Sequence, residues 1–140
     1  MVELSLGIAR RCLKDMVRYA SERRQFGQTI NRFGQIQRHI ADSFAEYRAA
    51  RAYVYDVARR LHLEVSGHRL DSDGTKLYTA AMAKNVADRA IQVFGGYGYM
   101  GEYVVERMWR DAKLLEIGGG TIEAHQKNIA RDLARLDRLP

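Results

Sequence analysis

The chain has 140 residues, a mass of 16.0 kDa and a formal net charge of +6. Hydrophobic residues make up 46% and charged residues 29%, values of a folded globular chain that exclude disorder and low-complexity sequence. The length suits one core, so we assign residues 1–140 to a single domain. Because no apolar run reaches about 18 residues, we expect no membrane partner.

The balance of 23 basic to 17 acidic residues favours phosphates, carboxylates or nucleic acid as partners. The basic residues are spread along the chain, which disfavours a dedicated nucleic-acid surface. Cys12 has no second cysteine to pair with, and the four histidines do not lie at metal-ligand spacing. We therefore expect no metal site and a reducing compartment, the cytoplasm, with a mitochondrial matrix as the alternative.

Apolar residues recur at helical spacing in five stretches. These stretches are residues 4–20, 33–62, 76–94, 103–115 and a last one that starts at Thr121. The third should begin after Asp71-Ser72-Asp73, whose side-chain oxygens suit a helix cap. No alternating strand pattern extends beyond a few residues. The sequence therefore predicts an all-α fold, an antiparallel four-helix up-and-down bundle with an additional short helix.

The run Gly118-Gly119-Gly120-Thr121 precedes the last predicted helix. Consecutive glycines let backbone N–H groups approach an anion, and a helix N-terminus adds partial positive charge. Thr121 suits an N-cap or a hydroxyl donor to a ligand. A flexible turn with an ordinary cap is the alternative interpretation.

Two further segments place rings beside cations or glycines. Arg23 and Arg24 stand next to Gln25 and Phe26, so the guanidinium groups can bind phosphate while the ring stacks on a ligand. Favourable placement of cations at a helix C-terminus explains the same residues. The segment 92–99 is a glycine-rich helix exit, either a surface for a flat or phosphorylated ligand or a simple C-cap. It lacks the strand–loop–helix context of a dinucleotide fingerprint.

In this order, the motifs resemble the C-terminal helical domain of the flavin-dependent acyl-CoA dehydrogenases. The resemblance covers essentially the whole chain and rests on residues 19–27, 92–99, 109–113, 116–121 and 129–131. It implies FAD as cofactor, α,β-dehydrogenation of an acyl-CoA thioester, and a dimer or tetramer in which FAD reaches a neighbouring subunit. Members of this family also have an N-terminal helical domain and a middle β domain, for which we see no counterpart in this chain.

The resemblance also implies which residues contact the cofactor and the substrate. The FAD contacts are Arg23, Arg24, Gln25, Phe26, Gln92, Val93, Phe94, Gly95, Gly96, Thr121 and Glu123, and Gly120 is adjacent to substrate. Many members have the catalytic Glu at the position of Gly119, so we assign no catalytic residue within this chain. Some branches instead place the base on the first helix of this domain, at a position just before Met1.

Two functions follow from these observations. In the first, the chain is the C-terminal domain of an acyl-CoA dehydrogenase, completes its FAD site and oligomer interface, and receives its base from upstream. In the second, it is a naturally short, non-catalytic relative that acts as an interaction module or partner subunit. An exposed apolar face on the bundle favours the first function, and a polar face favours the second.

Overall fold

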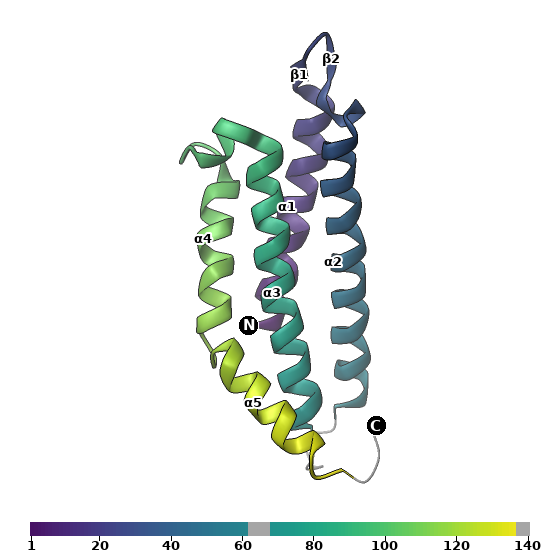
Figure 1. The fold of residues 1–140 in the computed structure, drawn as a ribbon, viewed down its shortest axis with the longest axis vertical. Coiled ribbons are helices and arrows are strands. Elements are labelled where there is room, and N and C mark those ends of the chain that lie inside the picture. The colour runs from purple at the N-terminus through teal and green to yellow at the C-terminus, as the bar shows by residue number, and fades with distance from the viewer. Residues whose placement is uncertain (62–67, 137–140) are drawn as a thin grey trace.

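The computed structural model describes residues 1–61 and 68–136. Their helices and strands are α1 (Val2–Glu22), β1 (Arg24–Gln25), β2 (Gln28–Thr29), the 3-10 helix η1 (Ile30–Arg32), α2 (Gly34–Arg60), α3 (Arg69–Phe94), the 3-10 helix η2 (Gly95–Tyr99), α4 (Val104–Ile117) and α5 (Ile122–Leu133). The first four α-helices lie side by side as a bundle, and α5 crosses its lower end (Figure 1). The predicted all-α bundle is confirmed.

Helix α3 is the centre of the packing, because it contacts α1, α2, α4 and α5. Its buried positions are mostly small: Ala80, Ala83, Ala87 and Ala90 are fully inaccessible to solvent. Alanine lets neighbouring helices approach closely while it keeps a high helix propensity. The core therefore forms around this alanine face.

The start of α3 differs from the sequence prediction. The helix begins at Arg69 rather than at Lys76, and none of the side chains that the structure describes forms a capping hydrogen bond at its start. Asp71 pairs with Arg60, and Asp73 lies within the helix and faces α5. These carboxylates find ion-pair partners from other helices, so they do not serve as caps. The predicted end of the second helix, at His62, falls outside the described residues; α2 ends at Arg60.

A short hairpin that the sequence pattern did not indicate follows α1. Strands β1 and β2 pair antiparallel, with Gln25 opposite Gln28. Phe26 and Gly27 form the two-residue turn with φ of 50° and 80°, the positive values that such turns require. Two residues per strand are too few for alternation to show in a sequence. The hairpin projects beyond the end of the bundle and carries Phe26 at its tip, 91% exposed (Figure 1).

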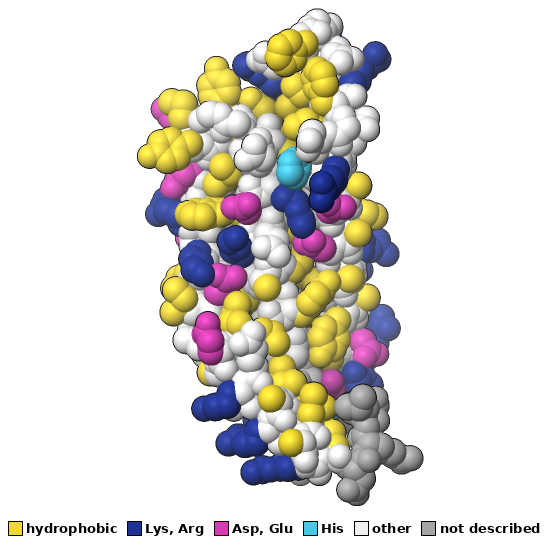
Figure 2. Space-filling model, viewed as in Figure 1, with side chains coloured by type: hydrophobic (Ala, Val, Ile, Leu, Met, Phe, Trp, Pro, Cys, Tyr) yellow, Lys and Arg dark blue, Asp and Glu magenta, His cyan; other side chains and the backbone are white. Residues whose placement is uncertain are grey.

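The visible surface is mixed in charge. Figure 2 shows basic, acidic and hydrophobic side chains distributed over one face, from the hairpin end to the lower end. In residues 1–61 and 68–136 no helix is long and apolar enough to cross a membrane. Across those same residues, no cluster of three His, Cys, Asp or Glu side chains is arranged to hold a metal ion.

Candidate functional site

A groove at the hairpin end brings together two of the three predicted cofactor segments. Its volume is about 790 Å³. The first segment contributes Arg23, Gln25 and Phe26, and the second contributes Val93, Phe94, Gly95 and Gly96. Five further lining residues lie outside the predicted segments, namely Ile30, Phe33, Gln35, Ile36 and Met100. Tyr19 and Tyr97 also line the groove and lie within the motifs 19–27 and 92–99, but they are not among the predicted cofactor contacts. Apolar residues at helical spacing, such as Phe33 and Ile36, are expected in the core. The structure places them in the lining of this groove, together with residues of α1 and α3.

Stacked aromatic rings build one wall of this groove. The rings of Tyr19 and Phe94 lie parallel with centroids 4.1 Å apart, and Tyr103 meets both edge-on. Burial raises the pKa of the Tyr19 hydroxyl, which donates a hydrogen bond to the Phe94 carbonyl at 3.4 Å. The Arg23 guanidinium lies 5.3 Å from the centre of the Tyr97 ring. The groove thus combines an apolar, aromatic surface with a cation at its rim.

Two predicted residues beside these segments do not line the groove. The Arg24 side chain turns back and donates to the Gly27 carbonyl at 3.0 Å, where it closes the hairpin. Gln92 lies one turn inside α3, and its carbonyl accepts the N–H of Gly95 at the helix end. Both residues therefore support the backbone that shapes the groove.

The third predicted segment lies at the opposite end of the bundle. Asp73, which is close to this end, and Phe94 are separated by about 30 Å along α3, at the helical rise of about 1.5 Å per residue. Thr121 caps α5, because its hydroxyl accepts the Ala124 N–H at 3.2 Å, as predicted. The pKa of Glu123 is lowered by hydrogen bonds from its own backbone N–H and from Thr121. The N-terminus of α5 is therefore capped by the chain's own groups.

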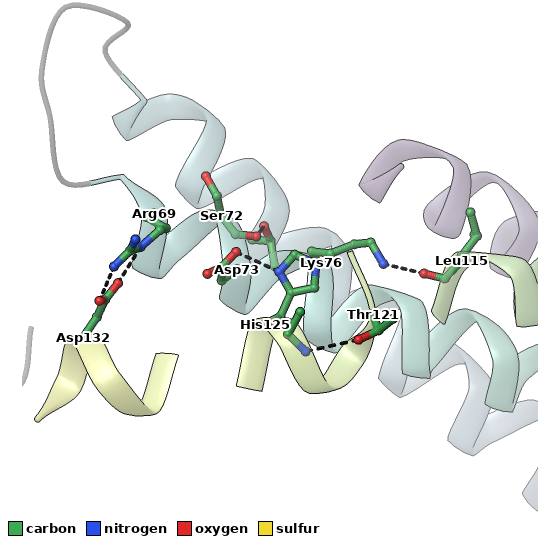
Figure 3. A network of polar contacts seen from close by, with 10 residues as sticks. Arg69, Ser72, Asp73, Lys76, Leu115, Thr121, His125 and Asp132 are labelled. Carbon is green, nitrogen blue, oxygen red and sulfur yellow. Dashed lines mark hydrogen bonds and ion pairs between the residues drawn. The ribbon is translucent and has the colours of Figure 1, made fainter. Parts of the chain in front are cut away.

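A cluster of ionisable side chains lies beside the N-terminus of α5 (Figure 3). His125 Nδ1 is 2.7 Å from Asp73 Oδ1, and the Lys76 ammonium donates to the Leu115 carbonyl. Lys76 is only 5% exposed, and burial lowers its pKa. Asp73 Oδ2 and His125 Nε2 are buried without a hydrogen-bond partner in the described structure. Sequence patterns do not predict this cluster, because 52 positions separate Asp73 from His125.

The cluster borders a cavity of about 390 Å³ that also reaches Met1, Glu3 and Gly119. Gly119 has a φ of 67°, and a Cβ placed on it would lie 3.2 Å from Met1 Cγ and 3.9 Å from Lys76 Cε. A side chain at position 119 would therefore point toward the Met1 and Lys76 side chains that line this cavity. Glycine leaves that position without a proton acceptor.

Comparison with known proteins assigns this architecture. The family model described as "Acyl-CoA dehydrogenase, C-terminal domain" matches residues 1–134. The chain belongs to the acyl-CoA dehydrogenase family. It is 44% identical over 132 residues to a probable acyl-CoA dehydrogenase of Bacillus subtilis, covering 94% of this chain and 34% of the relative. It is 41% identical over 131 residues to the mitochondrial isovaleryl-CoA dehydrogenase of Arabidopsis thaliana, covering 91% and 31%.

Solved structures of acyl-CoA dehydrogenases share this fold. The butyryl-CoA dehydrogenase of Megasphaera elsdenii superimposes with a TM-score of 0.88 at 37% identity, over 94% of this chain and 34% of that one. An acyl-CoA dehydrogenase of Geobacillus kaustophilus gives a TM-score of 0.87 at 31% identity, over 92% and 34%. The chain spans about a third of the length of the curated relatives it matches.

Proposed function

We propose that this chain is the C-terminal domain of an FAD-dependent acyl-CoA dehydrogenase, which carries out α,β-dehydrogenation of an acyl-CoA thioester. Its contribution is to bind part of the FAD and to form an oligomer interface in a dimer or tetramer. The groove that joins residues 23–26 to residues 93–96 carries this proposal, because it unites the two longest family motifs in one surface. Its aromatic wall suits a flat ring system, and Arg23 at the rim suits phosphate.

The separation of the motifs supports an oligomeric site. The groove lies at one end of α3, and Thr121 and Glu123 lie toward the other. We assign the groove to FAD that reaches over from a neighbouring subunit, and the turn at Gly118–Thr121 to the cofactor and substrate of its own subunit. Gly120 is the residue of that turn that we place beside substrate.

The chemistry divides between the cofactor and the chain. When bound, FAD supplies the acceptor for the β hydride. The α proton needs a basic group, which Gly119 does not provide. The cavity beside Gly119 is bordered by Met1, so a carboxylate on the residues that precede Met1 in a longer polypeptide would have a route into it. The chain's own role in this step is to shape that cavity through the glycine turn.

Exposed apolar side chains near the same turn favour a domain that is covered in the whole enzyme. Met1 is 45%, Leu114 61% and Ile117 56% exposed. Met1 and Leu114 both approach within 4.0 Å of the Cβ position of Gly118, so they form one patch. Burying this patch against another domain removes its apolar surface from water.

The second candidate is a short relative without catalytic activity that acts as an interaction module or partner subunit. The observation that favours it is the missing acceptor at Gly119. For either function we propose the cytoplasm as the compartment; relatives named above include a bacterial and a mitochondrial enzyme.

The intact mass of the native polypeptide separates the two functions. A mass well above 16.0 kDa supports the enzyme, and a mass of 16.0 kDa supports the short module. In the longer polypeptide, Arg23→Gln should weaken FAD retention about tenfold, the worth of one charge-assisted hydrogen bond. Arg107→Gln, an exposed arginine of α4 outside the groove, is the matched control. Equal retention in both variants would contradict the assignment of the groove to FAD.

A further inference from the structure

A second groove runs between α1 and α2, and of its described lining residues only Glu3 also borders the cavity beside Gly119. Its volume is about 880 Å³. The walls are one face of each helix, with Glu3, Gly7 and Arg10 on α1, and Arg48 and Arg51 among the residues on α2. We propose that this groove binds the phosphate groups of a nucleotide-sized ligand.

The arginines of this groove differ from others on the same helices. Arg11, Arg38 and Arg60 each pair with an aspartate four positions away on their own helix. Such a pair neutralises the guanidinium charge locally. Arg10, Arg48 and Arg51 have no carboxylate within ion-pair distance anywhere in residues 1–61 and 68–136.

Aromatic rings take the place of the missing carboxylates. Four positions before Arg48 stands Phe44, with the guanidinium 6.0 Å from the ring centre. Four positions after Arg51 stands Tyr55, at 4.5 Å. A ring below a guanidinium orients it without cancelling its charge, so the N–H groups keep their capacity to bind an anion.

The clustered charge has an energetic cost that an anion would remove. Arg48 and Arg51 are three residues apart on one helix face, about 5–6 Å between Cβ atoms, where like charges repel. Arg10 adds a third positive charge from α1, and Glu3 is the only acidic side chain among the described residues of the lining. A phosphate group with several oxygens can accept hydrogen bonds from more than one guanidinium at once.

The rest of the lining suits a ligand larger than phosphate alone. Tyr47 and Tyr55 provide ring surface, and Leu6 and Val54 provide apolar contact. Gly7 has open space beyond its Cβ position, so no side chain fills the groove there. The volume falls in the range of small-molecule sites, which favours a base or another ring joined to phosphate. A free nucleotide and the nucleotide part of coenzyme A share this chemistry.

Calorimetric titration of the 140-residue chain tests the proposal, with ADP, coenzyme A and inorganic pyrophosphate as probes. We expect saturable binding to this groove, weakened by salt, and about tenfold weaker in Arg48→Gln and in Arg10→Gln. Arg107→Gln removes the same charge from α4 and should leave binding unchanged. In the Arg23→Gln background, where the proposed FAD groove binds phosphate less well, the loss caused by Arg48→Gln should persist, which separates the two sites.

The probes distinguish the source of the ligand. Tighter binding of coenzyme A than of ADP would identify the ligand of this groove as the nucleotide part of an acyl-CoA thioester. The reverse order would identify it as a free nucleotide. Amide chemical shifts should change at Gly7 and Tyr55 when the probe is added. The proposal is overturned if none of the three probes saturates, if Arg107→Gln weakens binding as much as Arg48→Gln, or if polyglutamate binds more tightly than ADP.

Discussion

In the turn Gly118–Thr121, Gly120 is the position where adding a single methyl group should disturb the structure most. Its φ is 97°, and a Cβ placed on it would lie 2.8 Å from His125 Nε2 and 3.2 Å from His125 Cε1. Gly120→Ala therefore imposes two separate costs. The backbone must hold a conformation that L residues rarely adopt, and the imidazole ring must shift from its present position against Asp73.

Each cost has an approximate magnitude. The left-handed backbone costs alanine about 1–2 kcal/mol. Displacing His125 breaks its hydrogen bond with Asp73, whose side chain is 11% exposed, and leaves a buried carboxylate that costs about 1–3 kcal/mol. Together these predict a loss of about 2–5 kcal/mol in the free energy of unfolding. A stability of about 5–15 kcal/mol makes this loss easy to measure.

Urea unfolding followed by circular dichroism measures this free energy, with Gly101→Ala as the control. Gly101 has open space at its Cβ position and no positive φ, so its substitution should change stability by less than about 0.5 kcal/mol. In the His125→Ala background the ring is gone, and Gly120→Ala should then cost only the backbone strain. A coupling free energy between the two substitutions below about 0.5 kcal/mol would refute the steric argument.

Three further outcomes follow from buried or paired side chains. Cys12 is fully buried and its pKa is raised by burial to about 12, so iodoacetamide should label it at pH 8 only after unfolding; labelling of the native chain at the rate of a free thiol would contradict this. Glu46→Gln should cost about 1–2 kcal/mol of unfolding free energy, because it weakens the two hydrogen bonds from Arg89, at 2.8 and 2.7 Å, that join α2 to α3; Glu102→Gln, an exposed carboxylate, is the control. Arg69 holds the pKa of Asp132 below its ordinary value of 3.8 in the folded chain. Below pH 3.8 the unfolded chain therefore binds more protons than the folded chain. The contribution of the ion pair to stability is present above pH 3.8 and is lost as the pH falls through the lowered pKa. The Tm difference between wild type and Asp132→Asn should therefore shrink as the pH falls below 4, and a constant difference would argue against the pair.

Helical periodicity predicted most of the fold because it reports which side of each helix is buried. The range 103–115 was close to the observed α4, and Thr121 capped the last helix as predicted. The predicted start of α3 was wrong because local capping rules treat Asp71 and Asp73 as residues that precede the helix. Their partners, Arg60 and His125, come from other helices, and sequence spacing holds no information about such contacts.

The residues of the candidate site also fall into those that the sequence predicted and those that only the packing of helices revealed. Residues 23–26 and 93–96 carried recognisable motifs, and their meeting in one groove was implied by family resemblance rather than by spacing. Tyr19 and Phe33 also line that groove. Tyr19 lies at the start of the motif 19–27 but was not a predicted cofactor contact, and Phe33 lies outside the predicted segments. The buried cluster around Lys76 and the arginine groove between α1 and α2 could not be predicted, since each depends on how two helices are rotated against each other.

The sequence by itself determined the helical class, the glycine turns and the family, because these depend on local spacing and on short contiguous motifs. Only the tertiary structure decided which motifs share a surface. It placed residues 23–26 beside 93–96, and it placed Thr121 toward the far end of α3. Among residues 1–61 and 68–136, it also gives Arg48 and Arg51, on the face of α2 that meets α1, no carboxylate partner. The physical reason is that hydrogen bonds along a helix act over four residues, whereas packing, ion pairs and cavities depend on distances between residues far apart in the chain.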